Sequence, residues 1–344
     1  MAIGYWLLAN LLNEFRQDLV SGEWVLFATG RAKKPVSEPE KENGAYQSKE
    51  KCPFEDIYGS KQEILWLYPD KKDKWEIAVI KNKYPAIEPG VCQPGSKSGP
   101  FSTYPAVGHH DVIVYRDHDK HFADFSTDQL SAVVGVYKKR YKEIFKESGE
   151  CLQYVMIFHN FGFQAGASLH HPHSQIISMP ILPPDVARSL NGSFGFFKQS
   201  GQKVYDLIVQ WEKEQEKRII YENDWFVAFC PFVSKSPYEV RIFPKDGHAH
   251  FEQMPDPLNN YLADAMAAVF KKLKKTLGNP PYNFFIHTAA ASDYPSRKFH
   301  EFYTWHIEVI PKFVTIGGLE LGTGIDINVV DPDEAAKLLR ETNV

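Results

Sequence analysis

A run of histidines near the middle of the chain carries the residue types most able to do chemistry. Residues 166–175 read Gly-Ala-Ser-Leu-His-His-Pro-His-Ser-Gln and precede a mostly apolar stretch. If this stretch is a strand, alternate side chains share a face, so His171, His173 and Gln175 lie on one side. An imidazole held there can be a metal ligand, a general base or a nucleophile. The turn from Gly166 to Ser168 offers backbone N–H groups and a hydroxyl, which predicts a phosphorylated substrate.

The elements that must position this run occur twice along the chain. In the first half, strands over 75–80 and 111–115 precede a helix that opens with a Ser126/Gln129 capping box, and a strand over 154–158 and then the histidine strand follow. The second half repeats the order with strands over 225–229 and 239–243, a helix capped by Asp256, and strands over 282–286 and 305–309. The Gly/Ser/Asn-rich stretch 189–202 between the halves predicts a linker.

This repeat predicts an α+β fold made of two related half-barrel units, each a mostly antiparallel sheet with a helix across it. The units span residues 14–188 and 205–344. Residues 171–175 align with Thr304-Trp305-His306-Ile307-Glu308, where only the central histidine is kept and the glycine turn is lost. We therefore expect the first unit to be catalytic and the second to be degenerate.

Composition limits the cellular setting and the partners. A length of 344 residues with 43% hydrophobic residues predicts about two domains with sizeable cores. The net charge of −4 argues against general nucleic-acid binding. Four widely spaced cysteines do not form a disulfide framework, which favours a reducing cytoplasm. The apolar residues 5–12 lack the features of a signal peptide and are too short to span a bilayer, so no membrane association is expected.

Four segments in order resemble the galactose-1-phosphate uridylyltransferase family, a transferase branch of the histidine-triad superfamily. They are the opening basic segment 16–35, the Asn82-Lys83-Tyr84-Pro85 segment, the active-site block 160–175 and the C-terminal block 317–336. The resemblance implies a ping-pong mechanism. His173 would attack the α-phosphorus of UDP-glucose, release glucose 1-phosphate and hold UMP, which a hexose 1-phosphate such as galactose 1-phosphate would then take.

The resemblance also implies roles for other residues. Ser168 and Gln175 would donate to the non-bridging phosphate oxygens, where charge must be held in the transition state. Arg31 and Lys34 would supply countercharge, and Asn82 would lie on the nucleotide side. Asn160 and Gly166 belong to the active-site block, and Glu320 and Asn328 are candidates for the sugar hydroxyls. A homodimer is expected by the same resemblance, with the N-terminal basic segment reaching the partner's site.

A structural zinc ion is a further implication of the resemblance. The matching ligand positions are Cys52, Glu55, His118 and His171, with Glu55 in place of the family's second cysteine. Zinc accepts carboxylate oxygen together with sulfur and imidazole nitrogen, so this set is chemically reasonable. The alternative is a decayed site in which residues 52–54 form an ordinary loop. A second metal, which some members hold in the C-terminal half, is not predicted because Thr304 replaces one of its histidines.

Other functions use the same residues. An ADP-glucose or dinucleotide phosphorylase would use His173 but accept inorganic phosphate. A nucleotide hydrolase is disfavoured because the neutral amide of Gln175 cannot readily activate water. A catalytically silent nucleotide-binding protein is disfavoured by the intact histidine block. We associate the phosphorylase branch with the sequence His-Ser-His at the centre of the active-site block. This chain has His171-Pro172-His173 there, which favours the uridylyltransferase.

Overall fold

A computed structural model describes residues 13–33, 49–291, 298–313 and 315–344. The strands are β1 Glu14–Gln17, β2 Trp24–Phe27, β3 Ile64–Tyr68, β4 Ile77–Lys81, β5 Ser96–Ser98, β6 Phe101–Thr103, β7 His110–Tyr115, β8 Tyr154–Phe161, β9 His173–Met179, β10 Ile219–Glu222, β11 Phe226–Phe229, β12 Val240–Pro244, β13 Tyr282–His287, β14 His306–Pro311 and β15 Asp326–Asn328. The α-helices are α2 Thr127–Ser148, α3 Pro184–Ser200, α4 Val204–Gln215, α5 Asn259–Leu277, α6 Gly318–Thr323 and α7 Pro332–Glu341.

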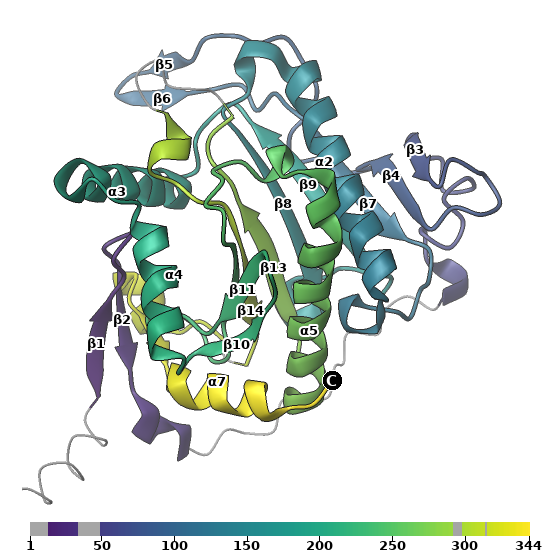
Figure 1. Ribbon diagram of the computed structural model, residues 1–344. Coiled ribbons are helices and arrows are strands. Elements are labelled where there is room, and N and C mark those ends of the chain that lie inside the picture. The colour runs from purple at the N-terminus through teal and green to yellow at the C-terminus, as the bar shows by residue number, and fades with distance from the viewer. Residues whose placement is uncertain (1–12, 34–48, 292–297, 314) are drawn as a thin grey trace, which may run out of the picture.

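One large antiparallel sheet of ten strands runs through the molecule (Figure 1). From one edge to the middle its order is β3-β4-β7-β9-β8, and from the other edge to the middle it is β10-β11-β12-β14-β13. The two halves therefore share one strand order and meet where β8 pairs with β13, from Tyr282 opposite Phe161 to Ile286 opposite Ile157. The predicted α+β fold with a duplicated unit is confirmed.

Two long helices lie side by side across one face of this sheet (Figure 1). Helix α2 connects β7 to β8 and begins at the predicted capping box, in which the Ser126 hydroxyl accepts from the backbone N–H of Gln129. Helix α5 occupies the equivalent place in the second half. It begins at Asn259, after a 3-10 turn over Asp256–Leu258. The prediction that Asp256 caps this α-helix is therefore wrong. The main core between the helices and the sheet draws residues from both halves.

The predicted linker 189–202 is wrong, because most of it is helix α3. Its glycines do not supply flexibility. A Cβ added at Gly192 would lie 1.7 Å from the backbone oxygen of Val20, so glycine permits a close approach between the helix and the N-terminal segment. Leu190 and Ser193 are buried on the same helix. Gly192 and Ser193 therefore lie on the packed side of this helix, whereas Asn191 and Ser200 are exposed.

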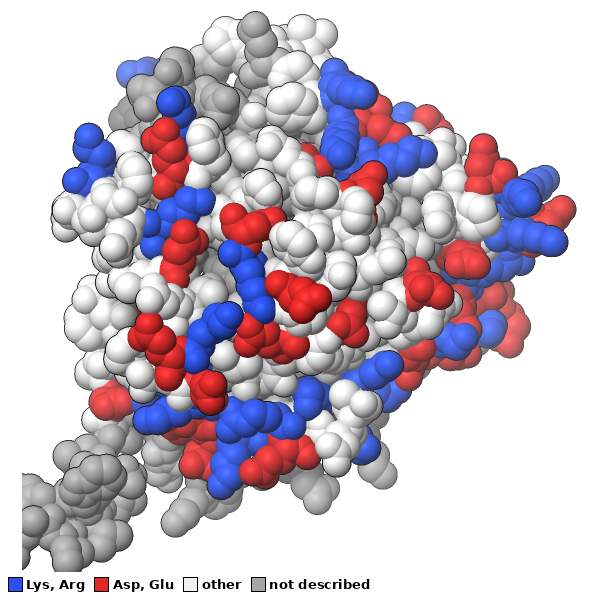
Figure 2. Space-filling model, in the orientation of Figure 1, with Lys and Arg blue, Asp and Glu red and all other residues white. Residues whose placement is uncertain are grey.

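Smaller elements surround the main sheet. Strands β1, β2 and β15 form a separate three-stranded sheet, and β5 with β6 forms a hairpin. In the part of the chain that the structure describes, no helix has the length and apolar character needed to cross a bilayer. On the face shown in Figure 2, acidic and basic side chains are interspersed.

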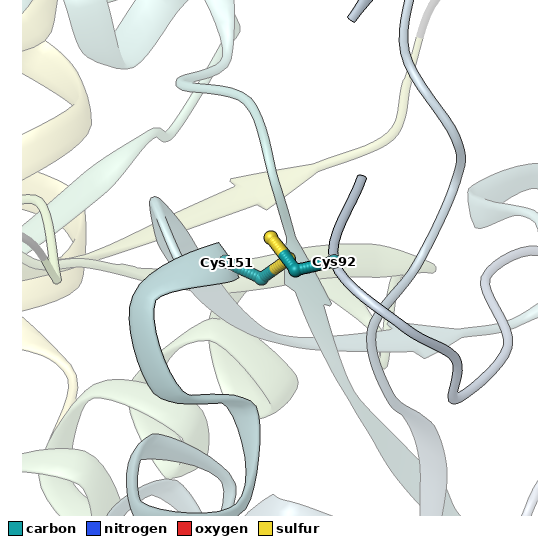
Figure 3. The surroundings of a disulfide bond; sticks show 2 residues. All are labelled: Cys92 and Cys151. Carbon is teal, nitrogen blue, oxygen red and sulfur yellow. A yellow bond between two sulfur atoms is a disulfide. The ribbon is translucent and has the colours of Figure 1, made fainter. Parts of the chain in front are cut away.

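Two of the four cysteines are paired, which differs from the expectation that all would stay reduced. Cys92, in the loop between β4 and β7, forms a disulfide with Cys151, which follows α2 (Figure 3). The other two, Cys52 and Cys230, are free and buried. The partners are 59 residues apart in sequence and meet only through the tertiary fold. The cysteine content therefore no longer supports a reducing compartment, and the cytoplasmic location stays a prediction.

Candidate active site

The side chains of strand β9 point to two faces of the sheet. One face is packed against the helices, and the other could hold a substrate. The Ser174 hydroxyl lies 2.6 Å from the hydroxyl oxygens of both Tyr115 and Tyr137, on the α2 side of the sheet. The Nδ1 atom of His159 lies 3.0 Å from the same hydroxyl. Because side chains alternate along a strand, His173 and Gln175 point to the opposite face. This network fixes the strand from beneath, and the two predicted catalytic side chains share the other side.

His173 is held with one ring nitrogen engaged and the other available. Its Nδ1 atom lies 2.9 Å from the backbone oxygen of His171, so Nδ1 carries the proton and donates it there. The neutral ring then has its lone pair on Nε2. Burial lowers the pKa of His173, which keeps the ring neutral at physiological pH. The ring of Phe54 packs edge-on against it, with centroids 5.2 Å apart. A buried, neutral and oriented imidazole can act as a nucleophile.

Gln175 is half-buried and is contacted from the neighbouring strand β7. Its Oε1 atom lies 2.9 Å from Nε2 of His110. The Nδ2 atom of Asn82 lies 3.1 Å from the same His110 nitrogen, and the backbone N–H of Ala86 donates to His110 Nδ1 at 3.0 Å. The structure therefore brings predicted residues Gln175 and Asn82 together through a histidine that the sequence analysis did not select.

The small-residue turn lies beside Asn160 at the end of β8. Gly166 has a φ of +84° in the left-handed region, where glycine is favoured. The N–H groups of Gly166 and Ala167 already donate to the carbonyls of Phe163 and Gly162. The expectation that they would bind a phosphate is therefore wrong. Ser168 is exposed beyond them. The turn can thus offer the Ser168 hydroxyl but not all of its backbone donors.

Three of the four predicted metal ligands converge near His173, and the fourth, Glu55, lies beside two of them. Cys52, His118 and His171 are buried, and their sulfur and ring nitrogens lie within 4.8 Å of one another. The Glu55 carboxylate lies 2.7 Å from His118 Nδ1 and 3.5 Å from His171 Nδ1. The two Nδ1 atoms are 3.1 Å apart, near the separation of about 3.3 Å that two nitrogens on one tetrahedral zinc would have.

The chemistry of this donor set also fits zinc. His171 Nε2 lies 2.6 Å from the backbone oxygen of Tyr115, so it donates there and leaves the Nδ1 lone pair facing the other ligands. Burial lowers the pKa of His171 to about 4, so the ring is neutral, as a ligand must be. Cys52, His118 and His171 therefore suit zinc, and the Glu55 carboxylate is within reach of the two histidines as a fourth donor.

Other predicted residues lie in different parts of the molecule. Arg31 lies in a 3-10 turn over Thr29–Lys33 that follows β2. Asn328 ends β15 of the small sheet, and its carbonyl accepts from Ala28 N–H, just after β2. The Asn328 amide is buried and bonds to Ser234 O and Val330 N, which gives it a structural role. The Glu320 carboxylate accepts from Gly317 N–H at the start of α6. Lys34 lies outside the described residues.

The second half contains a related cluster around His306. His306 Nδ1 lies 3.2 Å from the backbone oxygen of Thr304, and its ring stacks between those of Phe243 and His287. His287, His306 and Glu308 are close enough to share an ion, but the Arg241 guanidinium lies 3.4 Å from the Glu308 carboxylate. The Arg241 cation already balances that carboxylate, which disfavours a metal ion there, and the absence of a second metal stays a prediction.

Sequence reasoning missed three residues of the site: Phe54, His110 and Asn283. The Asn283 amide donates to both Asn160 Oδ1 and the Ala165 carbonyl at 2.7 Å. A sequence signal existed for His110. It lies two residues before Val112, on the same face of a strand that pairs with the His173 strand, so its side chain could have been placed on that face. Phe54 lies between two predicted metal ligands, but its contact with His173 depends on the folded loop.

Comparisons with known proteins agree with this geometry. The model of the galactose-1-phosphate uridyl transferase N-terminal domain matches residues 8–183, and a domain of unknown function (DUF4921) matches residues 101–342. ADP-glucose phosphorylase of Arabidopsis thaliana is 32% identical over 97% of this chain and 94% of its own. Galactose-1-phosphate uridylyltransferase of Thermotoga maritima is 27% identical over 96% of this chain and 99% of its own.

Solved structures give the same result. The crystal structure of the Arabidopsis thaliana ADP-glucose phosphorylase with bound ADP-glucose superposes with a TM-score of 0.82 at 30% identity, covering 97% of this chain and 100% of that one. A uridylyltransferase structure superposes with a TM-score of 0.71 at 26% identity, covering 96% and 97%. The duplicated fold and the histidine site define an enzyme of the histidine-triad superfamily, and they support nucleotidyl transfer through a histidine. The chain belongs to the galactose-1-phosphate uridylyltransferase family.

Proposed function

We propose that this enzyme transfers a nucleoside monophosphate from a nucleoside diphosphate glucose, through a covalent intermediate on His173. The observation that carries the proposal is the bond from His173 Nδ1 to the His171 carbonyl, which leaves Nε2 as the attacking atom. Nε2 forms a bond to the α-phosphorus, and the bond from that phosphorus to the bridging oxygen breaks. Glucose 1-phosphate leaves with the bonding electrons, and the nucleotide stays on the ring.

The second step returns the nucleotide to an acceptor. A phosphate oxygen of the acceptor attacks the α-phosphorus, the P–N bond breaks, and Nε2 regains its lone pair. Gln175 and Ser168 would donate to the non-bridging oxygens, where negative charge must be held in both steps. Gln175 has no acidic proton to give and cannot readily act as a base toward water, so transfer is favoured over hydrolysis.

For the donor and acceptor we propose ADP-glucose and inorganic phosphate, with ADP and glucose 1-phosphate as products. This proposal is supported by the 32% identity to an ADP-glucose phosphorylase over nearly the full length of both chains. The second candidate is transfer of UMP from UDP-glucose to galactose 1-phosphate, which the sequence analysis favoured. It is supported by His171-Pro172-His173 and by the match to the uridyl transferase domain.

A zinc ion held by Cys52, Glu55, His118 and His171 is part of the proposal. When bound, it would supply structural bracing, because its ligands come from the 52–55 loop, the segment after β7 and the residue two before His173. Phe54 sits inside the first of these segments and packs against the His173 ring. Elemental analysis of the purified protein is expected to give one zinc per chain and less in Cys52→Ser. A zinc-free, fully active protein would contradict this part.

We also propose a homodimer in which Arg31 and Lys34 reach the partner's site. Arg31 is exposed in the 3-10 turn that follows β2, and β2 belongs to a different sheet from the one that holds His173. A nucleoside diphosphate sugar carries two negative charges that need countercharge. Sedimentation should give twice the chain mass, and mixing inactive His173→Ala with inactive Arg31→Ala chains should restore part of the activity if the site is shared. A monomer with full activity would contradict the proposal.

The deciding experiment mixes the enzyme with ADP-glucose or UDP-glucose alone. A burst of glucose 1-phosphate equal to the enzyme concentration, with nucleotide bound to His173, is expected from one of the two donors. Adding inorganic phosphate or galactose 1-phosphate then identifies the acceptor. Continuous release of glucose 1-phosphate without any acceptor would indicate hydrolysis, and no burst with either donor would overturn the proposal.

A further inference from the structure

The orientation of the Gln175 amide follows from a backbone donor two contacts away. An amide N–H can only donate, so the bond from Ala86 N–H to His110 Nδ1 requires that Nδ1 be unprotonated. A neutral imidazole carries one proton, which must then be on Nε2. That N–H points at Gln175 Oε1, 2.9 Å away. His110 therefore holds the carbonyl oxygen of Gln175, and the NH2 group is the end left for a ligand.

The neighbouring contact with Asn82 is consistent with this proton count. The Asn82 Oδ1 atom accepts from Tyr84 N–H at 2.9 Å, so Nδ2 is the atom that faces His110. Nδ2 and the protonated Nε2 cannot both donate to each other, so their 3.1 Å approach is a contact and not a hydrogen bond. The His110 proton is therefore available to Gln175 alone.

Asn160 is oriented by the same logic from the other half of the molecule. The Ala165 carbonyl can only accept, so Asn283 must present its NH2 group to it. The same NH2 group then donates to Asn160 Oδ1 at 2.7 Å and leaves the Asn160 NH2 group as the free end. The Gln175 amide on β9 and the Asn160 amide on β8 are thus each held by a hydrogen bond to the carbonyl oxygen.

We infer that His110 is a positioning residue for the transfer reaction, which keeps Gln175 as a hydrogen-bond donor to the transferring phosphoryl group. An amide that rotated by 180° would turn its carbonyl oxygen toward the phosphate and repel the charge that develops there. The inference rests on the proposed function, since it assigns the phosphoryl group as the partner of that NH2 group. It adds a residue for which no role was predicted, and it ties the 82–86 segment to the reaction through Ala86.

Two substitutions separate the two bonds of His110. An Asn side chain reaches the place of Nδ1, so His110→Asn keeps an acceptor for Ala86 but loses the donor to Gln175. A Gln side chain reaches the place of Nε2, so His110→Gln keeps that donor. The matched control is His109→Asn, because His109 is the preceding residue and lies near Glu147 instead.

The kinetic test measures the single-turnover rate of nucleotide transfer to His173. We expect His110→Asn to slow it by about 10- to 100-fold with little change in donor affinity, as for loss of an outer partner. His110→Gln should recover most of the rate, and His109→Asn should leave it unchanged. In a Gln175→Ala background His110→Asn should have no further effect, because the residue acts through Gln175. Equal slowing in both backgrounds would overturn the inference.

A second measurement does not depend on activity. Nitrogen-15 NMR of the full chain with labelled histidine reports the tautomer, with the His110 signals assigned by their loss in His110→Gln. A protonated Nε2 and a bare Nδ1 are expected, and the reverse tautomer would overturn the inference. If no donor labels the unaltered enzyme, the proposed function fails, while the tautomer still decides how the Gln175 amide is oriented.

Discussion

The two halves of this molecule hold a histidine in the same way and surround it differently. In each, Nδ1 faces the backbone oxygen two residues earlier, at 2.9 Å for His173 and 3.2 Å for His306. Both rings are buried, and burial lowers the pKa of each. The shared fold therefore provides a neutral, oriented imidazole twice.

The differences lie in the residues around each ring. In the sheet register Gln175 faces Val112, whereas the equivalent Glu308 faces Arg241. Burial opposes ionisation of Glu308, but Arg241 outweighs it and lowers the pKa of that carboxyl. Tyr205 of α4 also packs against the His306 ring. A charged pair and a helix thus occupy, in the second half, the space that the first half leaves to a ligand.

The largest expected effect tests which histidine reacts. His173→Ala should lower turnover by about 10⁴-fold or more and abolish covalent labelling, because the nucleophile is gone. His306→Gln, in the other half, should keep one nucleotide per chain. Mass spectrometry of the labelled protein is the measurement. Nucleotide found on His306 would show that the comparison between the halves is wrong.

Exchanging the neighbouring residue tests what the amide contributes. Gln175→Glu gives the first half the carboxylate of the second, without its arginine, and should slow labelling by about 10²- to 10³-fold. Adding Val112→Arg would rebuild the ion pair of the second half, and we expect stability but not activity to return. Single-turnover rates and thermal unfolding measure the two effects. A rate within a few-fold of the original for Gln175→Glu would contradict the donor role.

Substitutions in the second half should lower the stability of the protein and leave the covalent labelling unchanged. Arg241→Gln leaves both Glu308 and the buried Glu239 without their shared cation, which should cost about 3–5 kcal/mol of unfolding free energy. Glu308→Gln in the same chain should recover only part of that loss, because Glu239 still lacks its cation. Chemical denaturation measures the change, and labelling of the folded fraction should remain one nucleotide per chain. Loss of labelling by folded protein would show that this cluster takes part in the reaction.

The smallest effect is the pH dependence of labelling. Only neutral His173 can attack, and burial lowers its pKa from the usual 6.5. The labelling rate should therefore stay nearly constant as the pH falls from 8 toward about 6.5 and decline only at lower pH. A rate profile at saturating donor measures this. A midpoint near the usual value would mean that the ring is exposed, and a midpoint above it would mean that the ring is paired with an anion.

Local patterns predicted the parts of the fold whose signals are contained in a few neighbouring residues. The His173 strand, the Ser126 capping box and the repeated element order all follow from spacing along the chain. The failures are tertiary. Gly192 has the composition of a linker, but it approaches Val20 inside a helix. The disulfide of Cys92 and Cys151 joins residues with no sequence relation.

The site divides in the same manner. The nucleophile and Gln175 belong to one strand and could be found from their alternation. His110 and Asn283 act from β7 and β13, so their contacts required the sheet register. The metal set was found through a family resemblance, and its convergence in the structure depends on three separate segments. Asn328 lies on the small sheet and Arg31 in the turn after β2 of that sheet, whereas His173 lies on the large sheet.

The β8–β13 pairing makes the two halves one hydrogen-bonded body. Although the sequence divides into repeats, cutting the chain near residue 200 would expose the edge of β8, eight residues long and largely buried in the intact sheet. Such an open edge is a template for pairing with other chains. The second half therefore covers a strand edge that would otherwise be open to pairing with other chains.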